Sequence, residues 1–166
     1  MVDKQAFRSA MASLGTAVNV VTAQSPDGLA GCTISAVCSV TDEPPTLMVC
    51  INRDSKNSQA FIDSGHLCIN IVSADQQNVA QLFASRSVPM QERFAAASWH
   101  SMPSGAPALD GALGSLDCSI RSVTAVGTHN VLLCEVQAVE SAESGDALIY
   151  LGRNFHRLAM ASATLA

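Results

Sequence analysis

The fold is decided by Ser115-Leu116-Asp117-Cys118-Ser119-Ile120-Arg121-Ser122-Val123-Thr124-Ala125-Val126, followed by Gly127-Thr128 and then by His129-Asn130-Val131-Leu132-Leu133-Cys134-Glu135-Val136-Gln137-Ala138-Val139-Glu140-Ser141. In the first run, Leu116, Cys118 and Ile120 alternate with polar residues, as is typical of a half-exposed strand. A further apolar run, Ala147–Leu151, follows shortly after Ser141. We therefore expect three successive strands, at Ser115–Val126, His129–Ser141 and Ala147–Leu151.

Four more strand-like segments lie nearer the N-terminus. The turn sequence Ser25-Pro26-Asp27-Gly28 separates the first two, because proline presets one backbone dihedral and glycine tolerates a positive φ. The segments on either side of it should form a hairpin. A double proline, Pro44-Pro45, precedes the third. The expected strands are Ala17–Ala23, Leu29–Ser35, Thr46–Ile51 and His66–Val72.

The predicted helices are fewer and shorter than the strands. Asp3–Leu14 has apolar residues at helical spacing and ends at Gly15. Ser73 and Gln76 form a capping box for a helix that runs to about Phe83. We expect two more helices, at Asp54–Ile62 and around Gln91–Phe94, with a long loop over the rest of Val88–Pro107.

The balance of elements predicts the fold class. Strands outnumber helices, and the last third of the chain is strand after strand. This pattern favours a mostly β fold, an antiparallel β-barrel with peripheral α-helices, over a parallel sheet. With 166 residues and no linker or repeat, residues 1–166 should form a single domain.

Composition narrows the possible partners and the compartment. Apolar residues make up 48% of the chain and charged residues 14%, so we expect more buried surface than a monomer needs, and hence a dimer or a larger assembly. A net charge of -5 argues against nucleic-acid binding. The N-terminus lacks a signal-peptide pattern and no apolar run is long enough to span a bilayer, so we expect a cytoplasmic protein without a membrane partner. The cysteines are interpreted as reduced, buried thiols: Cys32, Cys38, Cys50, Cys68, Cys118 and Cys134.

Several catalytic motifs are absent from the sequence. There is no G-x-G-x-x-G dinucleotide fingerprint, no P-loop, no H-E-x-x-H and no G-x-S-x-G. The cysteines form no C-x-x-C pair and the four histidines are widely spread, so we expect no metal site. A metal hydrolase or a serine-nucleophile enzyme therefore has little support.

Three stretches carry candidate chemistry, and each also has a purely structural interpretation. Gly31–Val40 is rich in small residues and hydroxyls, so a flat ring could approach its backbone, but taken alone this stretch is better interpreted as an ordinary strand and turn. Cys50–Ser58 leads into a helix N-terminus where Lys56 and free N–H groups could bind an anion, although a plain N-cap at Asp54 or Ser55 is as reasonable. In Val126–Leu132, a histidine follows a glycine turn, which alone suggests a histidine bonded to nearby backbone.

Taken together, in this order and spacing, these stretches make the chain similar to the short-chain flavin reductase family. The likeness begins at Phe7–Leu14, continues through Ala17–Thr22 and ends at Ile149–His156. The run Ala36–Asn52 is especially close to one branch, the reductase components of 4-hydroxyphenylacetate 3-monooxygenases. Two positions depart from the pattern: Cys38 stands where many relatives carry serine or threonine, and Gly152 gives the final turn less positive charge than some relatives have.

The resemblance implies a fold, an activity and a set of partners. The fold would be the FMN-binding split barrel, usually a homodimer. The enzyme would oxidise NADH, or less often NADPH, and reduce FAD or FMN by hydride transfer between the stacked rings. Reduced flavin would then pass to the separate monooxygenase component of a two-component aromatic hydroxylase.

The resemblance also implies site residues. The flavin ring and its ribityl chain would lie on Thr33, Ile34, Ser35, Ala36, Cys38, Ser39 and Val40, with Asn52 beside them. Ser55, Lys56 and Asn57 would hold the phosphate, and Phe83, Ala84 and Arg86 would line the flavin site. His129 would position the nicotinamide, with Arg153, Phe155 and His156 closing the pocket.

Two other functions are also compatible with the sequence. A second hypothesis is a non-catalytic carrier that binds FMN in the same fold, and a third is a structural β-barrel without a ligand. Trp99 is interpreted as pinning its loop to the body of the protein. Arg93 and Arg121 are interpreted as solvated or ion-paired side chains.

Overall fold

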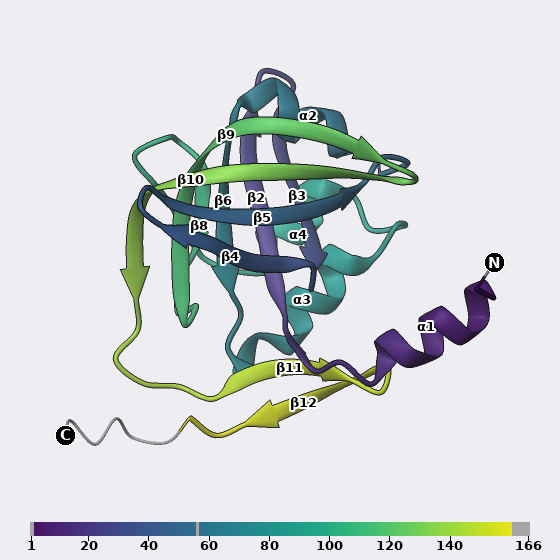
Figure 1. The fold of residues 1–166 in the computed structure, drawn as a ribbon. Coiled ribbons are helices and arrows are strands. Elements are labelled where there is room, and N and C mark those ends of the chain that lie inside the picture. The colour runs from purple at the N-terminus through teal and green to yellow at the C-terminus, as the bar shows by residue number, and fades with distance from the viewer. Residues whose placement is uncertain (1, 56, 161–166) are drawn as a thin grey trace.

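A seven-stranded antiparallel sheet forms most of the computed structural model, which describes residues 2–55 and 57–160. In Figure 1, the half of this sheet that contains β9, β10, β5 and β4 crosses over the half that contains β2, β3 and β6, so the sheet is rolled. Its edge strands β3 and β4 are not paired with each other within the described residues, so the roll stays open. The antiparallel, mostly β split barrel predicted from the sequence is thus confirmed. The strand order is β3 (Gly28–Ile34), β2 (Asn19–Ser25), β6 (His66–Ile71), β9 (Gly114–Val126), β10 (His129–Ser141), β5 (Pro45–Asn52) and β4 (Val37–Asp42).

Two apolar clusters lie on opposite faces of β2. The barrel interior contains Val21 and Ala23 together with large side chains such as Phe61, whereas Val20 points outward into a second cluster with Phe83. Because the outer face of β2 is covered by helices, nearly every residue of the strand is buried. That double burial explains why Val20 and Val21 are both apolar although they point to opposite faces of the strand.

Two helices form the outer layer against β3 and the outward face of β2. Helix α3 (Gln77–Ala84) follows a 3-10 turn, η1 (Ala74–Gln76), which begins with the predicted capping box between Ser73 and Gln76. Helix α4 (Met90–Ala95) follows Pro89, and both helices contribute to the second cluster. Helix α1 (Lys4–Ala12) is capped by the Asp3 carboxylate, which accepts from the Ala6 amide at 2.8 Å, and it projects from the body in Figure 1.

Helix α2 begins later than predicted. It spans Ser58–Ser64, and the segment before it is a turn rather than a first helical turn. The Asn52 side-chain oxygen accepts from the Asp54 amide at 2.9 Å, and the Ser55 amide donates to the Asn52 carbonyl at 3.1 Å. The N-cap is Asn57, so the interpretation of Asp54 or Ser55 as an N-cap was wrong. An asparagine that bonds the backbone two residues on favours such a turn over a helix.

Three strand features were not predicted. Strand β4 follows β3 directly. The chain after α4 is not a continuous loop but forms a small hairpin of β7 (Trp99–Ser101) and β8 (Pro107–Leu109). A third sheet joins β1 (Thr16–Ala17), β11 (Ala147–Leu151) and β12 (Asn154–Leu158). The β11–β12 loop is Gly152-Arg153, with φ of 60° and 64°, which matches the type I′ turns that favour two-residue hairpins.

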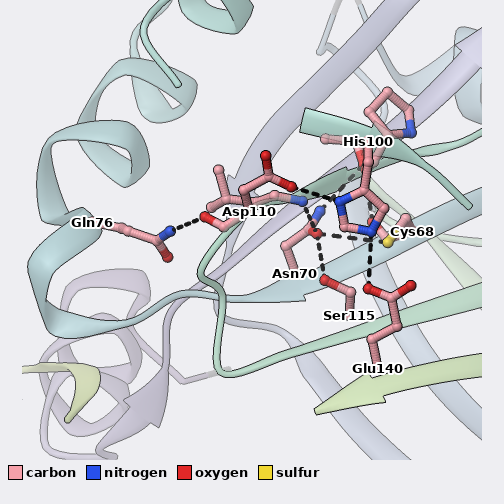
Figure 2. Close-up of polar contacts among 10 residues, drawn as sticks. Cys68, Asn70, Gln76, His100, Asp110, Ser115 and Glu140 are labelled. Atoms are coloured by element: carbon pink, nitrogen blue, oxygen red, sulfur yellow. Dashed lines mark hydrogen bonds and ion pairs between the residues drawn. The ribbon is translucent and has the colours of Figure 1, made fainter. Parts of the chain in front are cut away.

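A buried polar network fastens the β7–β8 hairpin to the barrel. The Asn70 side-chain oxygen accepts from the Leu109 amide at 2.7 Å and from the Ser115 hydroxyl at 2.9 Å, while its amide nitrogen donates to the Val20 carbonyl at 3.0 Å. Figure 2 shows this asparagine at the centre of the contacts. Because one side chain on β6 satisfies groups from three other strands, its loss would leave several buried polar atoms without partners.

His100, on β7, makes an exposed clamp above that network. Its Nδ1 bonds the Asp110 carboxylate at 2.6 Å and its Nε2 bonds the Glu140 carboxylate at 2.9 Å (Figure 2). Ionised carboxylates only accept, so both ring nitrogens must donate, and the ring is held as the imidazolium. The hydrogen bonds that His100 donates, first to Asp110 and then to Glu140, raise the pKa of His100. The clamp therefore weakens as the pH rises.

The thiols are less uniformly buried than expected. Cys68, Cys118 and Cys134 are buried, but Cys32 and Cys50 are half-buried and Cys38 is exposed. All six are unpaired. Burial raises the pKa of the Cys32 thiol to about 12, against a smaller lowering by the Arg93 charge, so this thiol is neutral at physiological pH. Among the described residues, no helix has the length and apolar character needed to cross a bilayer.

Candidate functional site

A cleft of about 560 Å³ opens where β3 and β5 end beside the connection between α3 and α4. Its volume lies in the range of small-molecule sites in proteins. It brings together eight of the residues that the resemblance assigned to the flavin: Thr33, Ile34, Asn52, Ser55, Asn57, Phe83, Ala84 and Arg86.

The β3 side of the cleft is shaped by a close approach of α3. A Cβ atom at Gly31 would lie 2.5 Å from Cε1 of Phe83, so only glycine lets this ring sit against the strand. The Thr33 hydroxyl donates to the Ala80 carbonyl at 2.6 Å, which ties the same two elements together. Phe83 itself is 1% exposed and forms an edge-on pair with Phe94. The wall is therefore rigid where Thr33 and Phe83 reach the cleft.

The turn before α2 makes a polar side of the cleft. The Asn57 amide group donates to the Gly31 carbonyl at 2.9 Å, and the Ser55 hydroxyl accepts from the Asn57 backbone N–H at 3.4 Å. Asn52 and Asp54 line the same side. Lys56, predicted to hold a phosphate, lies outside the described residues.

The connection between α3 and α4 makes the third side. The Ser85 hydroxyl accepts from the amides of Ser87 and Val88, at 3.2 and 3.3 Å, and so folds the connection into a tight turn. Arg93 then donates from Nε to the Val88 carbonyl at 2.9 Å and from Nη1 to the Phe83 carbonyl at 3.4 Å.

The structure corrects one arginine and confirms two other assignments outside the predicted site. Arg93 is only 7% exposed and forms no ion pair with a described carboxylate, so its interpretation as solvated or ion-paired was wrong. Arg121 is paired with Glu135 at 2.9 Å, as expected. Trp99 donates from Nε1 to the Phe94 carbonyl at 2.9 Å and packs its ring at a tilt against the Phe94 ring, so it does pin its segment to the body.

His129 lies next to the cleft rather than in its wall. It begins β10, and its Cα is the cross-strand partner of Asn52, which lines the cleft. Arg53, the next residue, donates its amide to the Thr128 carbonyl at 2.9 Å, so the two turns are bonded together. The exposed His129 ring shares a hydrogen bond with the Thr128 hydroxyl at 2.9 Å. Residues far apart in sequence thus place this imidazole at the rim.

Of the remaining nicotinamide residues, Arg153 lines a second hollow, whereas Phe155 and His156 are not among the residues that line it. Arg153 lines it together with Ser35, Arg8 and Tyr150, between α1 and the β11–β12 turn. Phe155 is half-buried and packs its ring against Tyr150 at 5.3 Å between centroids. The His156 Nε2 donates to the Leu151 carbonyl at 3.0 Å. Arg153 and Ser35 are thus brought together, whereas His156 bonds its own hairpin.

The last four assigned residues are not among those that line the main cleft. Cys38 and Ser39 line a different hollow on the β4–β5 side of the barrel, and Ala36 and Val40 are exposed next to them. The predicted flavin stretch therefore divides after Ile34, where the chain leaves β3.

Sequence reasoning missed part of the cleft wall. The missed residues come from the ends of β3 and β5, from the turn before α2 and from the α3–α4 connection. The sequence signal that could have found some of them is the position of Ser85, Ser87 and Pro89 between two predicted helices, which indicates a loop. They are Cys32, Ile51, Asp54, Ser85, Ser87, Val88, Pro89, Met90 and Arg93. The described residues contain no group of three histidine, cysteine, aspartate or glutamate side chains placed to hold a metal ion.

Comparison with known proteins assigns the family. Residues 11–159 match the model of the flavin reductase like domain. The chain belongs to this family. The flavin reductase-like chain is 49% identical to FMN reductase (NADH) RutF of Stutzerimonas stutzeri over 157 residues, which is 95% of the chain and 90% of that relative.

Two further matches support the same assignment. The 4-hydroxyphenylacetate 3-monooxygenase reductase component of Pseudomonas aeruginosa is 49% identical over 156 residues, covering 93% of this flavin reductase-like chain and 92% of the relative. The crystal structure of the Streptomyces globisporus NADH:FAD oxidoreductase SgcE6, in complex with NAD and FAD fragments, superimposes with a TM-score of 0.87 at 27% identity. That superposition covers 96% of each chain.

Proposed function

We propose that this protein is an NADH-dependent flavin reductase that binds FMN or FAD in the cleft between β3, β5 and the α3–α4 connection. The observation that carries the proposal is the cleft itself, which gathers eight of the residues assigned to the flavin from separate segments of the chain. The family assignment and the names of the relatives support the same activity.

The residues present fit a flavin. Ile34, Ile51, Val88 and Met90 give the cleft an apolar lining, and the polar groups are few and converge from the other sides. This combination is what a flat aromatic ring with a polar tail requires. Ser55 and Asn57 are placed to bond the tail, and Thr33 and Ile34 to carry the ring.

When bound, the flavin supplies the redox chemistry by accepting a hydride from the reduced nicotinamide. The chain's own residues have to hold the two rings face to face and shield them from water. We assign His129 to orient the nicotinamide, because it stands at the rim beside Asn52. Phe155 and Arg153, on β12 and the turn before it, are assigned to close the nicotinamide side. No side chain in the cleft has to give or take a proton, since hydride transfer needs no general acid or base.

The product would be reduced flavin for a second protein. One relative is by name the reductase component of a monooxygenase, which supports transfer of reduced flavin from this chain to a separate flavin-dependent oxygenase. We place both in the cytoplasm, in keeping with six unpaired thiols.

We also propose that the protein is a homodimer. The large apolar residues of α1 and of the turn after it are exposed, with Phe7 59%, Met11 46% and Leu14 56% accessible, and no residue of the helix is buried. Val126, Leu133 and Val139 are exposed along the two longest strands. Such a quantity of uncovered apolar surface is unusual for a soluble monomer. Light scattering after size exclusion should give a mass near 35 kDa, twice the 17.3 kDa of the chain, and a mass near 17 kDa would refute the dimer.

The activity is tested by mixing purified protein with NADH and an excess of FMN or FAD and following the NADH absorption band. We expect continuous turnover with free flavin, and a matched series with NADPH ranks the nicotinamides. A protein that binds flavin and turns yellow but does not consume NADH would instead be the non-catalytic carrier. A protein that neither binds flavin nor consumes NADH would be a structural barrel.

A further inference from the structure

The side chain of Arg93 is a buried cation that nothing in the described chain neutralises. It extends from α4 into the wall of the cleft and is only 7% exposed. No described carboxylate lies within 4 Å of it, and Asp54, the one carboxylate in the cleft lining, is not an ion-pair partner. A buried charge without a partner is costly, so such groups are normally paired or hold a ligand.

Its hydrogen bonds leave part of the guanidinium available. Of five N–H donors, one on Nε bonds the Val88 carbonyl and one on Nη1 bonds the Phe83 carbonyl. Nη2 has no hydrogen-bond partner among the described residues. Every side-chain nitrogen that is fully buried in the described residues does have a partner, so Nη2 is not fully buried. Nη2 must therefore reach open space, and Arg93 lines the cleft. The two carbonyl bonds fix the guanidinium in place, so this free edge is presented in a defined position.

We propose that Arg93 binds the anionic phosphate of the flavin and makes the cleft select phosphorylated flavins over uncharged ones. The inference rests on the proposed function, since it concerns the same cleft. A guanidinium offers two N–H groups in a plane and matches the oxygens of a phosphate. Arg86 lines the same wall but is exposed, so water screens its charge. The turn before α2, with Ser55 and Asn57, would bond the phosphate from the other side.

The test compares FMN with riboflavin, which has the same ring without the phosphate. Dissociation constants are measured by fluorescence titration for the wild type, Arg93→Met and Arg93→Lys. We expect Arg93→Met to weaken FMN binding about 10–100-fold more than riboflavin binding, the factor that one charged hydrogen bond is worth. Arg93→Lys, which keeps the charge but loses the planar fork, should lower the preference for FMN several-fold. Arg121→Met, which removes an arginine paired on the outside of the barrel, is the matched control and should change neither constant.

The outcomes separate this proposal from the proposed function. If the variants weaken FMN and riboflavin equally, Arg93 only holds the α3–α4 connection through its two carbonyl bonds and the proposal is overturned. If Arg93→Met does not fold, Arg93→Lys decides, and an unchanged preference refutes the assignment. A wild type that binds both flavins equally also refutes it. A wild type that binds no flavin at all refutes the proposed function instead.

Discussion

Replacing Gly31 by alanine tests how the cleft is built. The added methyl group would lie 2.5 Å from Cε1 and 2.8 Å from Cδ1 of Phe83, well inside contact distance. The ring cannot turn away freely, because its centroid lies 5.1 Å from that of Phe94 and 5.5 Å from that of Trp99. Either α3 must move away from β3 or the aromatic cluster must rearrange.

The size of the effect follows from this crowding. Forcing one extra methyl group into a packed core costs about 1–3 kcal/mol. The entropy of unfolding is about 2.1 cal/mol/K per residue, so near the Tm the free energy of unfolding of a 166-residue chain changes by about 0.35 kcal/mol for each kelvin. We therefore expect Gly31→Ala to lower the Tm by about 3–9 °C. Because Phe83 and Thr33 line the cleft from the displaced elements, flavin binding should weaken as well.

The assay is a thermal melt followed by circular dichroism, with two companion variants. Gly15→Ala is the control, because a Cβ there meets Ile149 only at an ordinary 3.7 Å, so its Tm should stay the same or rise slightly. Adding Phe83→Leu to Gly31→Ala should recover part of the loss relative to the sum of the single changes. A Tm of Gly31→Ala equal to that of the Gly15→Ala control would refute the clash with Phe83, and so would simple additivity of Gly31→Ala and Phe83→Leu.

Three further predictions follow from single side chains. His129→Ala should raise the KM for NADH with little change in flavin affinity, whereas His66→Ala, at the first residue of β6, should leave this KM unchanged. If both variants have the same KM for NADH, His129 does not orient the nicotinamide. His100→Gln should destabilise the fold by less than about 1 kcal/mol, as for exposed pairs. Because the pKa of His100 is raised, the stability difference between the wild type and His100→Gln should be complete below about pH 6.5, the pKa in the unfolded state. It should vanish as the pH rises through the pKa in the folded state. Urea midpoints across this pH range measure the difference, and a difference that stays constant with pH contradicts the clamp. Asn70→Leu should cost about 2–5 kcal/mol in chemical denaturation, because the Leu109 amide and Val20 carbonyl lose their buried partner; a loss under 1 kcal/mol would show that the network is not needed.

The long strands were predictable because alternation and turn chemistry are local. Ser115–Val126 and His129–Ser141 match β9 and β10 to within one residue, since each carries its own period and a glycine turn joins them. The β7–β8 hairpin was not predictable, because its three-residue strands have no period. They are held by Asn70 and Asp117, whose partners lie in distant segments. Such contacts become visible only when the chain is folded.

The site residues that lie in continuous runs of sequence were predictable, whereas those that reach the cleft only through contacts between distant segments were not. Thr33, Asn52 and Ser55 lie in runs that the family resemblance covers, and they meet in one cleft. Arg93 appeared to be a surface arginine because its helix is short and polar. The two carbonyls that hold it belong to residues five and ten positions away, on a connection whose path the sequence did not predict.

The absence of a catalytic motif is itself a consequence of the proposed chemistry. When both redox partners are bound cofactors, the protein has no proton to move and no nucleophile to activate, so no fixed pair of reactive residues is required. What it must supply is two surfaces, one for each ring, and a means to retain a diffusible ligand. The strand ends at Thr33 and Asn52 are rigid because sheet hydrogen bonds hold them, but the α3–α4 connection depends on the bonds of Ser85 and Arg93. Selectivity among flavins should therefore reside in that connection together with Arg93, and exchange of residues 84–93 between relatives with different flavin preferences should move the preference while the barrel stays the same. If preference instead followed the β3–β4 segment, the connection would be only a lid.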